Sequence, residues 1–224
     1  AAITIISGGF LALASSNGTQ VGLDIQKTFL LTTLVWVVLS IFASIPFLLG
    51  YTNAILVDAI FEAVSGITTT GSTVFSDLDK MPKGLLLWRG ILQWLGGIGI
   101  IVVAMVFLPE LRVGGMQIFR AEGFDTLGKI LPRATTIAFQ ISIIYVGITI
   151  ACGLAYVLAG MSFFDAVVHS FTTVATGGFS NYDNSFSVFS WKVEYVAILF
   201  MILSALPFVR YVQLINGQGT AVFK

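Results

Sequence analysis

Two long stretches of this sequence carry no charged residue, and they constrain the fold more than any other feature. One runs from Thr28 to Gly50 and the other from Ala134 to Phe164. Because roughly 20 apolar residues in a helix cross the hydrocarbon core of a bilayer, each stretch predicts a membrane-spanning helix. Only 10% of all residues are charged, against roughly 25% in soluble domains. The sequence therefore predicts an all-α polytopic membrane protein.

Each of these stretches is followed by a shorter segment that does not suit a full membrane crossing. The segment after residue 50 contains Asp58 and Glu62, and a charge at the bilayer centre costs at least about 2.5 kcal/mol. A half-length helix that enters the membrane from one side fits such a segment better. Further spans are expected from about residue 85 to 108 and from about residue 191 to 214.

The chain therefore has two similar halves, each with a span, a half-helix, a Thr/Gly stretch, a polar turn and a second span. A shift of 107 residues places Asp165 on Asp58 and Gly178 on Gly71. Repeats of this kind in membrane proteins usually surround a shared site. The expected organisation is the tail of a preceding helix (1–23), a first repeat (24–109), a basic connection (110–133), a second repeat (134–216) and the start of a further connection (217–224).

Basic residues predict the orientation in the membrane, because short cytoplasmic loops carry an excess of Lys and Arg. Lys27, Arg210, Lys224 and the connection 110–133 hold most of the eleven basic residues. We therefore expect this side to be cytoplasmic and the half-helices to enter from outside. The formal net charge is zero, so no charged face predicts nucleic-acid binding.

The two Thr/Gly stretches, which begin at residues 65 and 172, predict a cation site. Non-helical backbone at membrane depth is tolerated only where protein or a water-filled cavity satisfies its N–H and C=O groups. Carbonyls that face a cavity are cation ligands, and the C-terminal end of the preceding half-helix adds roughly half a negative charge. Gly admits conformations that turn successive carbonyls the same way, and Thr hydroxyls can hold the surrounding backbone. A neutral ring of carbonyls suits a weakly hydrated monovalent ion.

The sequence resembles the Trk/Ktr/HKT superfamily of potassium transporters, nearest its TrkH branch, in the segments EAVSGITTTGSTV, WRGILQWLGGIGIIV, RVGGMQIFRAE and TVATGGFSNYD. The resemblance implies a pseudo-fourfold, cation-channel-like fold of four span/pore-helix/filter/span repeats, of which this chain has two. It also implies potassium uptake across a bacterial inner membrane, with K⁺ as the transported ion, no organic cofactor and no enzymatic activity. The implied metal-binding residues are Thr68, Thr69, Thr70 and Gly71 in one filter and Ala175, Thr176, Gly177 and Gly178 in the other.

The same resemblance implies partners in the lipid bilayer and in the cytosol. Third and fourth repeats, or a second copy of the chain, would complete the pore, and the full-length protein would form a homodimer. A cytosolic ring that binds nucleotides would regulate it. The segment FMILSALPFVRY departs from the Gly/Asn-containing pattern of the family, so the inner pore lining near Ser204 and Pro207 stays unassigned.

Two other functions are compatible with the sequence. A membrane-embedded enzyme would use Glu62, Asp165 and His169 as an acid/base set, although no nucleophile or second metal ligand accompanies them. A structural subunit would use the half-helices for packing alone. The preference for K⁺ over Na⁺ and the coupling to H⁺ or Na⁺ do not follow from the sequence.

Several polar residues also have a structural interpretation. Asp58 and Asp165 are expected to cap the two half-helices, where a carboxylate meets free N–H groups. Glu62 and His169, one register apart, are expected to form hydrogen bonds within the half-helix region. Arg89 either anchors its span at the outer interface or pairs with an acidic residue such as Glu62.

Glycines and the single cysteine complete the sequence expectations. The glycines of LGGIGI, from residue 95, are expected to permit close helix packing, such as the approach of a half-helix. Cys152 lies within an apolar stretch and is expected to be a buried thiol, since no second cysteine is present to form a disulfide.

Overall fold

The structure, a computed structural model, describes residues 8, 9, 13, 25–50, 54–107 and 134–215. All regular elements within these residues are α-helices or short 3₁₀-helices, and none of these residues forms a β-strand. The all-α fold is therefore confirmed for the described part of the chain. The predicted connection 110–133 and the segment 217–224 lie outside it.

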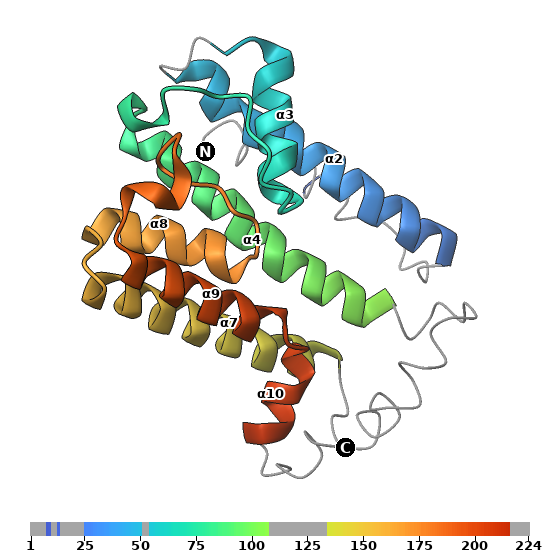
Figure 1. The fold of residues 1–224 in the computed structure, drawn as a ribbon. Helices are drawn as coiled ribbons and strands as arrows, with labels where there is room; N and C mark the ends of the chain where they lie inside the picture. The colour runs from blue at the N-terminus through green and yellow to red at the C-terminus, as the bar shows by residue number, and fades with distance from the viewer. Residues whose placement is uncertain (1–7, 10–12, 14–24, 51–53, 108–133, 216–224) are drawn as a thin grey trace.

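Each half of the chain follows the same order of elements (Figure 1). The first half contains α2 (Ile25–Leu49), α3 (Leu56–Ile67), η1 (Leu78–Lys80) and α4 (Lys83–Phe107). The second contains α7 (Ala134–Leu158), α8 (Phe163–Val174), η3 (Ser185–Val188), α9 (Trp191–Ala205) and α10 (Phe208–Ile215). α3 and α8 each have 12 residues. Because such a helix is only about 18 Å long, both are half-helices relative to a hydrocarbon core of about 30 Å.

Two helices among the described residues are long and apolar enough to cross a membrane, at Leu30–Leu49 and Ala138–Leu158. They lie within the two charge-free stretches of the sequence. α9 and α10 would give a third crossing if they form one span together, although they are bent by 82°. α4 has the same 25-residue length as α2 and α7.

The last predicted span, from about residue 191 to 214, is broken rather than continuous. α9 ends at Ala205, Leu206 has an extended backbone with ψ 144°, and α10 begins at Phe208. Pro207 explains the break, because its ring disfavours helical backbone at the preceding residue and it has no N–H group for the helical ladder. The bend falls in the segment that departs from the family pattern.

α4 lies between the two half-helices α3 and α8 (Figure 1). Its glycines allow both to approach closely. A Cβ atom on Gly96 would collide with the carbonyl oxygen of Ile67 at the end of α3, and one on Gly97 would lie 3.1 Å from Cα of Ala175, just after α8. The glycines of LGGIGI therefore permit close packing, as the sequence predicted.

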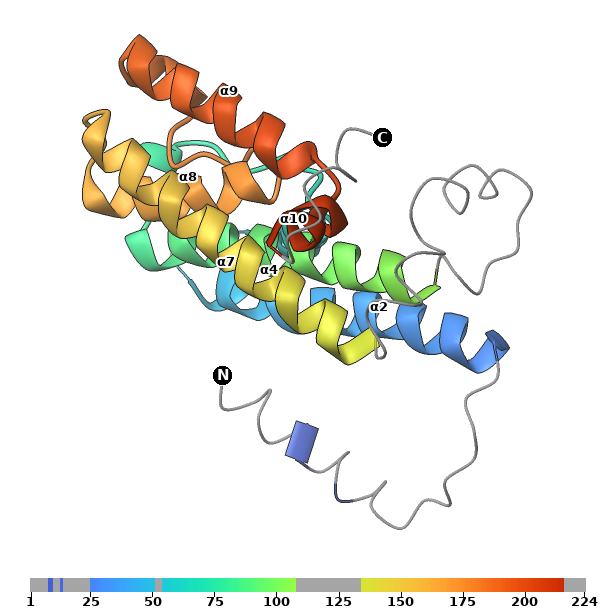
Figure 2. The ribbon, with the colours of Figure 1, turned by 90° about the horizontal axis from the view of Figure 1, so that it is seen from below.

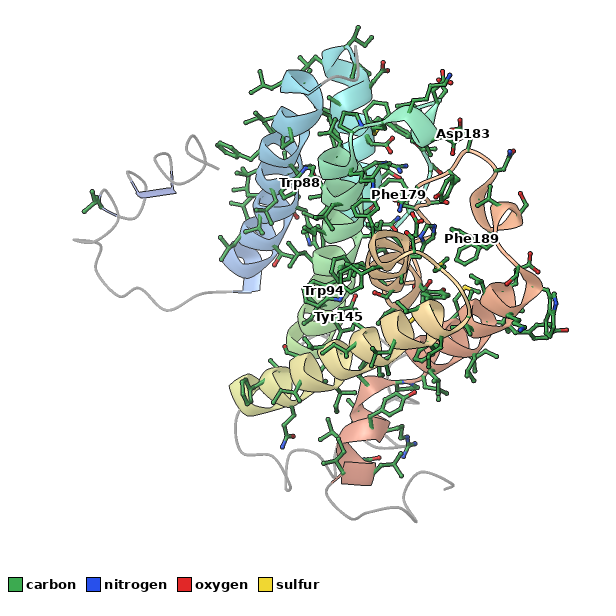
Figure 3. The ribbon with its side chains drawn as sticks, turned by 90° about the vertical axis from the view of Figure 1, so that its left-hand side faces the viewer. Trp88, Trp94, Tyr145, Phe179, Asp183 and Phe189 are labelled. Carbon is green, nitrogen blue, oxygen red and sulfur yellow. The ribbon has the colours of Figure 1, made fainter. Side chains whose placement is uncertain are left out.

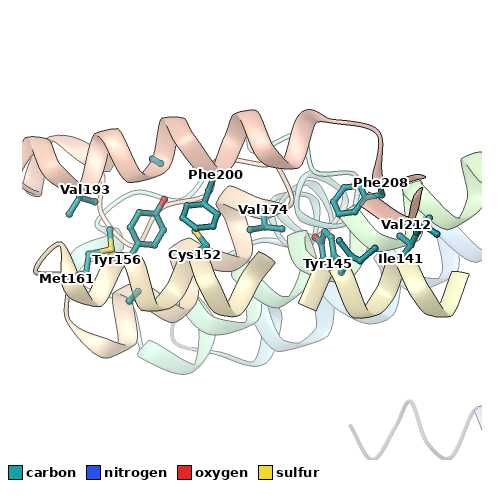
Figure 4. Close-up of a cluster of buried hydrophobic side chains, with 13 residues drawn as sticks. Ile141, Tyr145, Cys152, Tyr156, Met161, Val174, Val193, Phe200, Phe208 and Val212 are labelled. Atoms are coloured by element: carbon teal, nitrogen blue, oxygen red, sulfur yellow. The ribbon is translucent and has the colours of Figure 1, made fainter. Parts of the chain in front are cut away.

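α7 packs against α9 (Figure 2) and α10, and a buried apolar cluster joins the three helices (Figure 4). It includes Ile141, Tyr145, Cys152, Tyr156, Phe200, Phe208 and Val212. Cys152 is a buried free thiol, as expected. α4 joins this cluster through Trp94, whose carbonyl accepts a hydrogen bond from the Tyr145 hydroxyl at 3.0 Å. The second half is therefore packed as one body against α4.

Candidate functional site

The two Thr/Gly stretches have the same unusual backbone conformation. Thr69 and Thr176 both have left-handed φ angles, of 56° and 53°, and Gly71 and Gly178 have φ angles of 78° and 82°. A left-handed conformation strains a β-branched residue by an amount of order 1–3 kcal/mol and persists only where the surroundings hold it. Gly178, rather than Gly177, thus shares the conformation of Gly71.

Equivalent backbone hydrogen bonds hold the two stretches. In the first, the Ser65 carbonyl accepts from the N–H groups of Thr70 at 3.0 Å and Gly71 at 3.4 Å. In the second, the Thr172 carbonyl accepts from Gly177 at 2.9 Å and Gly178 at 3.5 Å. Each pair of hydrogen bonds holds the Thr/Gly stretch against the last turn of the half-helix that precedes it. The 107-residue register of the sequence therefore extends to the hydrogen bonds of the backbone.

The predicted site residues lie together in space. A Cβ atom on Gly71 would collide with the carbonyl oxygen of Gly177, so the two stretches are in direct contact. Threonine hydroxyls bond to the neighbouring backbone, since Thr68 donates to the Val64 carbonyl at 2.7 Å and Thr176 donates to the Ala175 carbonyl at 2.7 Å. The groups available to a cation here are backbone carbonyls and threonine hydroxyls.

Each half-helix binds the segment that follows its own Thr/Gly stretch. The Glu62 carboxylate accepts from the Thr73 hydroxyl at 2.9 Å and from the Val74 N–H at 3.2 Å. His169 is equivalent to Glu62 under the 107-residue shift. Its Nε2 lies 3.1 Å from the Ser180 hydroxyl, and its Nδ1 lies 2.9 Å from the Asp165 carbonyl. Glu62 and His169 are both fully buried.

These contacts agree with the structural interpretation of Glu62 and His169 as hydrogen-bonded residues of the half-helices. The rings of Phe186 and Phe189 both lie 5.3 Å, centroid to centroid, from the His169 ring. Both ring nitrogens of His169 already have partners within the protein. The arrangement therefore does not favour an acid/base enzyme built on Glu62, Asp165 and His169.

Arg89 is the partner of Glu62 and not an interfacial anchor. Its Nε lies 2.7 Å from Oε1 of Glu62, and both side chains are at most 1% exposed. Its Nη1 donates to the Ser180 carbonyl at 2.8 Å, and its Cζ lies 4.1 Å from the centre of the Phe179 ring. Nη2 of Arg89 is buried and has no hydrogen-bond partner among the described residues. Because both charged side chains are buried and paired with each other, this geometry indicates a structural role. Arg89 joins the first half-helix to the segment after the second Thr/Gly stretch.

The prediction that Asp58 and Asp165 are the helix caps was wrong. The N-cap residues are Ile55 and Ser162, and each aspartate is the third residue of its half-helix, within the first turn where its charge suits the helix dipole. The cap of α8 is Ser162, whose hydroxyl accepts from the Asp165 N–H at 3.2 Å and donates to the Asp165 carboxylate at 2.7 Å. Position decides this, because an N-cap side chain must stand directly before the helix to accept from the first free N–H groups, and aspartate and serine cap about equally well there.

Asp165 instead binds the segment after the second Thr/Gly stretch. Its carboxylate accepts from the Asn181 amide at 2.8 Å and from the Tyr182 hydroxyl at 3.1 Å. Asp58 is half-buried and forms no such bond with the other described residues. The two aspartates therefore share a register position and differ in their contacts.

Gln93 on α4 is a site residue that was not predicted from the sequence. The side chain is fully buried, and its Oε1 accepts a hydrogen bond from the Phe179 N–H at 3.1 Å. Figure 3 shows Phe179 where α4 and α8 approach each other. A buried polar side chain within an apolar membrane helix is by itself a signal of function. That signal was present in the sequence, but the partner lies 86 residues away.

Comparison with protein families finds one match over almost the whole chain. Residues 1–219 match the family model TrkH, described as a cation transport protein. Among curated proteins, the Trk system potassium uptake protein TrkI of Halomonas elongata is 47% identical over 206 residues, which cover 91% of this chain and 42% of that protein. The Trk system potassium uptake protein TrkH of Escherichia coli is 41% identical over 202 residues, which cover 88% of this chain and 42% of that protein.

A solved structure agrees with these matches. The crystal structure of the potassium transporter TrkH from Vibrio parahaemolyticus superimposes with a TM-score of 0.78 and 39% sequence identity. The superposition covers 91% of this chain and 41% of that one. The chain thus spans less than half the length of the relatives it matches.

Proposed function

Because this chain belongs to the TrkH family of cation transport proteins, we propose that it forms half of the pore of a potassium uptake protein. Residues 68–71 and 175–178 would contribute two filters to this pore. One observation carries the proposal: a left-handed Thr and a left-handed Gly recur 107 residues apart, each directly after a half-helix. Packing of membrane helices alone does not require this conformation.

The chemistry follows from the groups at the proposed site. Alternation of left-handed and other backbone conformations turns successive carbonyls toward one side, where they can replace the hydration shell of K⁺. α3 and α8 both end at these stretches, so the partial negative charge of each helix end favours a cation there. The bonded threonine hydroxyls limit the backbone motion that would let the filters close around a smaller ion.

The rest of the pore would come from outside this chain. We propose third and fourth repeats that complete a four-filter ring, in a full-length protein that forms a homodimer. The proposed setting is a bacterial inner membrane, with residues 110–133 cytoplasmic, the filters open to the outside and a cytosolic nucleotide-binding ring as regulator. Residues 24–109 and 134–216 would be the two repeats. The complete transporter, below, means this chain together with the remaining repeats.

The test is growth of a cell that lacks its own K⁺ uptake systems and depends on the complete transporter. A carboxylate in a filter would bind K⁺ too tightly and distort the ring, so Gly71→Asp and Gly178→Asp are each expected to abolish growth at low K⁺ and Rb⁺ uptake. Gly84→Asp is the matched control, because a Cβ atom on Gly84 meets no atom within 4 Å. Growth of the Gly71→Asp cell at low K⁺ would overturn the filter assignment.

A further inference from the structure

Gln93 brings the amide of one side chain to both Thr/Gly stretches. The side chain is 0% exposed, and Oε1 accepts from the Phe179 N–H, directly after Gly178. Nε2 is buried and has no hydrogen-bond partner among the described residues. The same nitrogen lies 3.5 Å from the position that a Cβ atom on Gly71 would take. One amide from α4 therefore reaches the second stretch by a hydrogen bond and lies near Gly71 of the first.

Gln93 also explains why residue 177 is glycine. A Cβ atom on Gly177 would lie 2.6 Å from both Nε2 and Oε1 of Gln93 and would collide with its Cδ. Gly177 is not among the glycines with a left-handed φ, so its backbone conformation alone does not require glycine. The need is steric, and the atoms that cause it belong to Gln93.

The first stretch shows what a side chain does at the equivalent position. Thr70 is equivalent to Gly177 under the 107-residue shift between the repeats. Its hydroxyl lies 2.8 Å from the Thr68 hydroxyl. That contact links two residues within the same stretch. In the second stretch no side chain is present at residue 177, and the Gln93 amide from the first repeat occupies the space instead.

We propose that Gln93 is a positioning residue of the second filter, and that it sets the K⁺/Na⁺ preference of the pore together with Gly177. The inference rests on the proposed function, since it assigns a role to the backbone of a filter. The Phe179 N–H is the first donor after the proposed ligands of the second filter. When its hydrogen bond to Gln93 is lost, the peptide groups of Gly177 and Gly178 gain freedom to turn. Discrimination between two ions of equal charge depends on the position and flexibility of such carbonyls.

The experiment is a double-mutant cycle in the complete transporter, read as Rb⁺ uptake in competition with Na⁺. Gln93→Met keeps the length of the side chain and removes the hydrogen bond, so it is expected to lower the K⁺/Na⁺ preference roughly two- to tenfold, the range that one hydrogen bond is worth. Gly177→Ala is expected to lower it similarly, because its Cβ atom displaces the amide. The double variant Gln93→Met/Gly177→Ala is expected to be no worse than either single variant, since both lose the same bond.

Two results would overturn the proposal. One is an unchanged K⁺/Na⁺ preference in Gln93→Met, and the other is multiplication of the two single effects in the double variant. Gln140→Met is the matched control, because Gln140 lies on α7 and forms no hydrogen bond with either described filter stretch. It is expected to leave the preference unchanged. If a Gln93 variant fails to reach the membrane, Gly177→Ala alone still tests the close approach of residue 177 to the Gln93 amide. The measured quantity is again the K⁺/Na⁺ preference.

Failure of this inference is distinguishable from failure of the proposed function. Gly71→Asp tests the filter assignment without involving the amide of Gln93. Uptake that survives Gly71→Asp would reject the filters themselves. Uptake that is lost in Gly71→Asp, with Gln93→Met behaving as the wild type, would reject only the role of Gln93.

Discussion

The left-handed glycines are the residues at which a single methyl group has the largest expected effect. Gly71→Ala would place a Cβ atom against the Gly177 carbonyl and would hold alanine at a φ of 78°. The left-handed backbone conformation alone is expected to cost about 1–2 kcal/mol in stability for alanine. We expect loss of Rb⁺ uptake and a lower unfolding temperature in detergent.

Gly147→Ala is the control for this prediction, because Gly147 lies within α7 and a Cβ atom there meets nothing within 4 Å. This variant is expected to take up Rb⁺ as the wild type does. A Gly71→Ala protein with normal uptake would contradict the contact between the two stretches.

The buried pair of Arg89 and Glu62 is a second prediction at the scale of the residue. Arg89→Met would leave a fully buried carboxylate without its cation, so we expect a loss of about 3–5 kcal/mol in unfolding free energy. Glu62→Gln combined with Arg89→Met removes both charges, and this double variant is expected to be more stable than Arg89→Met alone. Unfolding in detergent, followed by tryptophan fluorescence, measures both.

An exposed ion pair of the same length provides the control. Lys80 and Asp77 are 2.7 Å apart and largely exposed to solvent. The Lys80 ammonium donates a hydrogen bond to Asp77 and holds the pKa of that carboxyl below its usual value. Because water screens this pair, Lys80→Met is expected to leave the unfolding temperature almost unchanged. An Arg89→Met protein that unfolds like Lys80→Met would show that the buried pair contributes nothing.

Single residues were predictable from the sequence where their partners are local or repeat in register. Glu62 and His169 could be assigned as hydrogen-bonded residues because they occupy one register position in two halves. Arg89 had two open interpretations, since its partner Glu62 lies 27 residues away on another helix. The aspartate caps were wrong because both half-helices begin earlier than expected, so that Ile55 and Ser162 are the N-cap residues and each aspartate lies three residues further on. Separation along the chain therefore explains the open interpretation of Arg89, whereas the error about the caps concerned the first residue of each half-helix.

At the scale of the element, the packing of α4 depends on which of its glycines face the backbone of another helix. A Cβ atom on Gly96 would collide with the Ile67 carbonyl, whereas one on Gly99 would meet the Trp36 ring at an ordinary 3.6 Å. Gly96→Ala is therefore expected to displace the end of α3, to lose about 1–3 kcal/mol in unfolding free energy and to lower Rb⁺ uptake.

Gly99→Ala is the matched variant on the same helix, three residues further on. It is expected to retain uptake and to gain up to about 1 kcal/mol, because alanine favours the helix over glycine. Equal behaviour of the two variants would contradict the packing of α4 against the first half-helix. The sequence predicted that these glycines permit close packing, but it could not say which one faces the half-helix, since helices on both sides approach α4.

Helix boundaries were predictable to the extent that local rules decide them. Both half-helices were expected from their acidic residues and short length, and each is 12 residues long. The sequence predicted one continuous span here and not the break between α9 and α10, although Pro207 lies in this segment. A proline in an apolar stretch permits either a kinked span or two separate helices, and only the packing of α10 against α7 decides.

At the scale of the whole molecule, several hydrogen bonds join the two halves. They link residues of the first half to the segment that follows the second Thr/Gly stretch. Arg89 and Gln93 bind the backbone of residues 179 and 180, and the Leu78 N–H donates to the Asp183 carboxylate at 3.2 Å. α4 is covered by half-helices on two sides. α9, at the corresponding place in the second half, exposes large apolar side chains such as Tyr195, Leu199 and Ile202. An apolar surface of this kind faces either lipid or a further repeat.

This asymmetry leads to a prediction about the chain by itself. The two proposed filters would enclose only part of a cation, and the remaining sides would be open to lipid or solvent. Purified chain of 224 residues in liposomes is therefore expected to give no K⁺-selective Rb⁺ uptake, whereas the complete transporter in the same liposomes is expected to give it. A Gly71→Asp/Gly178→Asp variant of each is the control for leakage. Selective uptake by the chain, abolished in this variant, would contradict the need for further repeats and would mean that two copies pair to supply four filters.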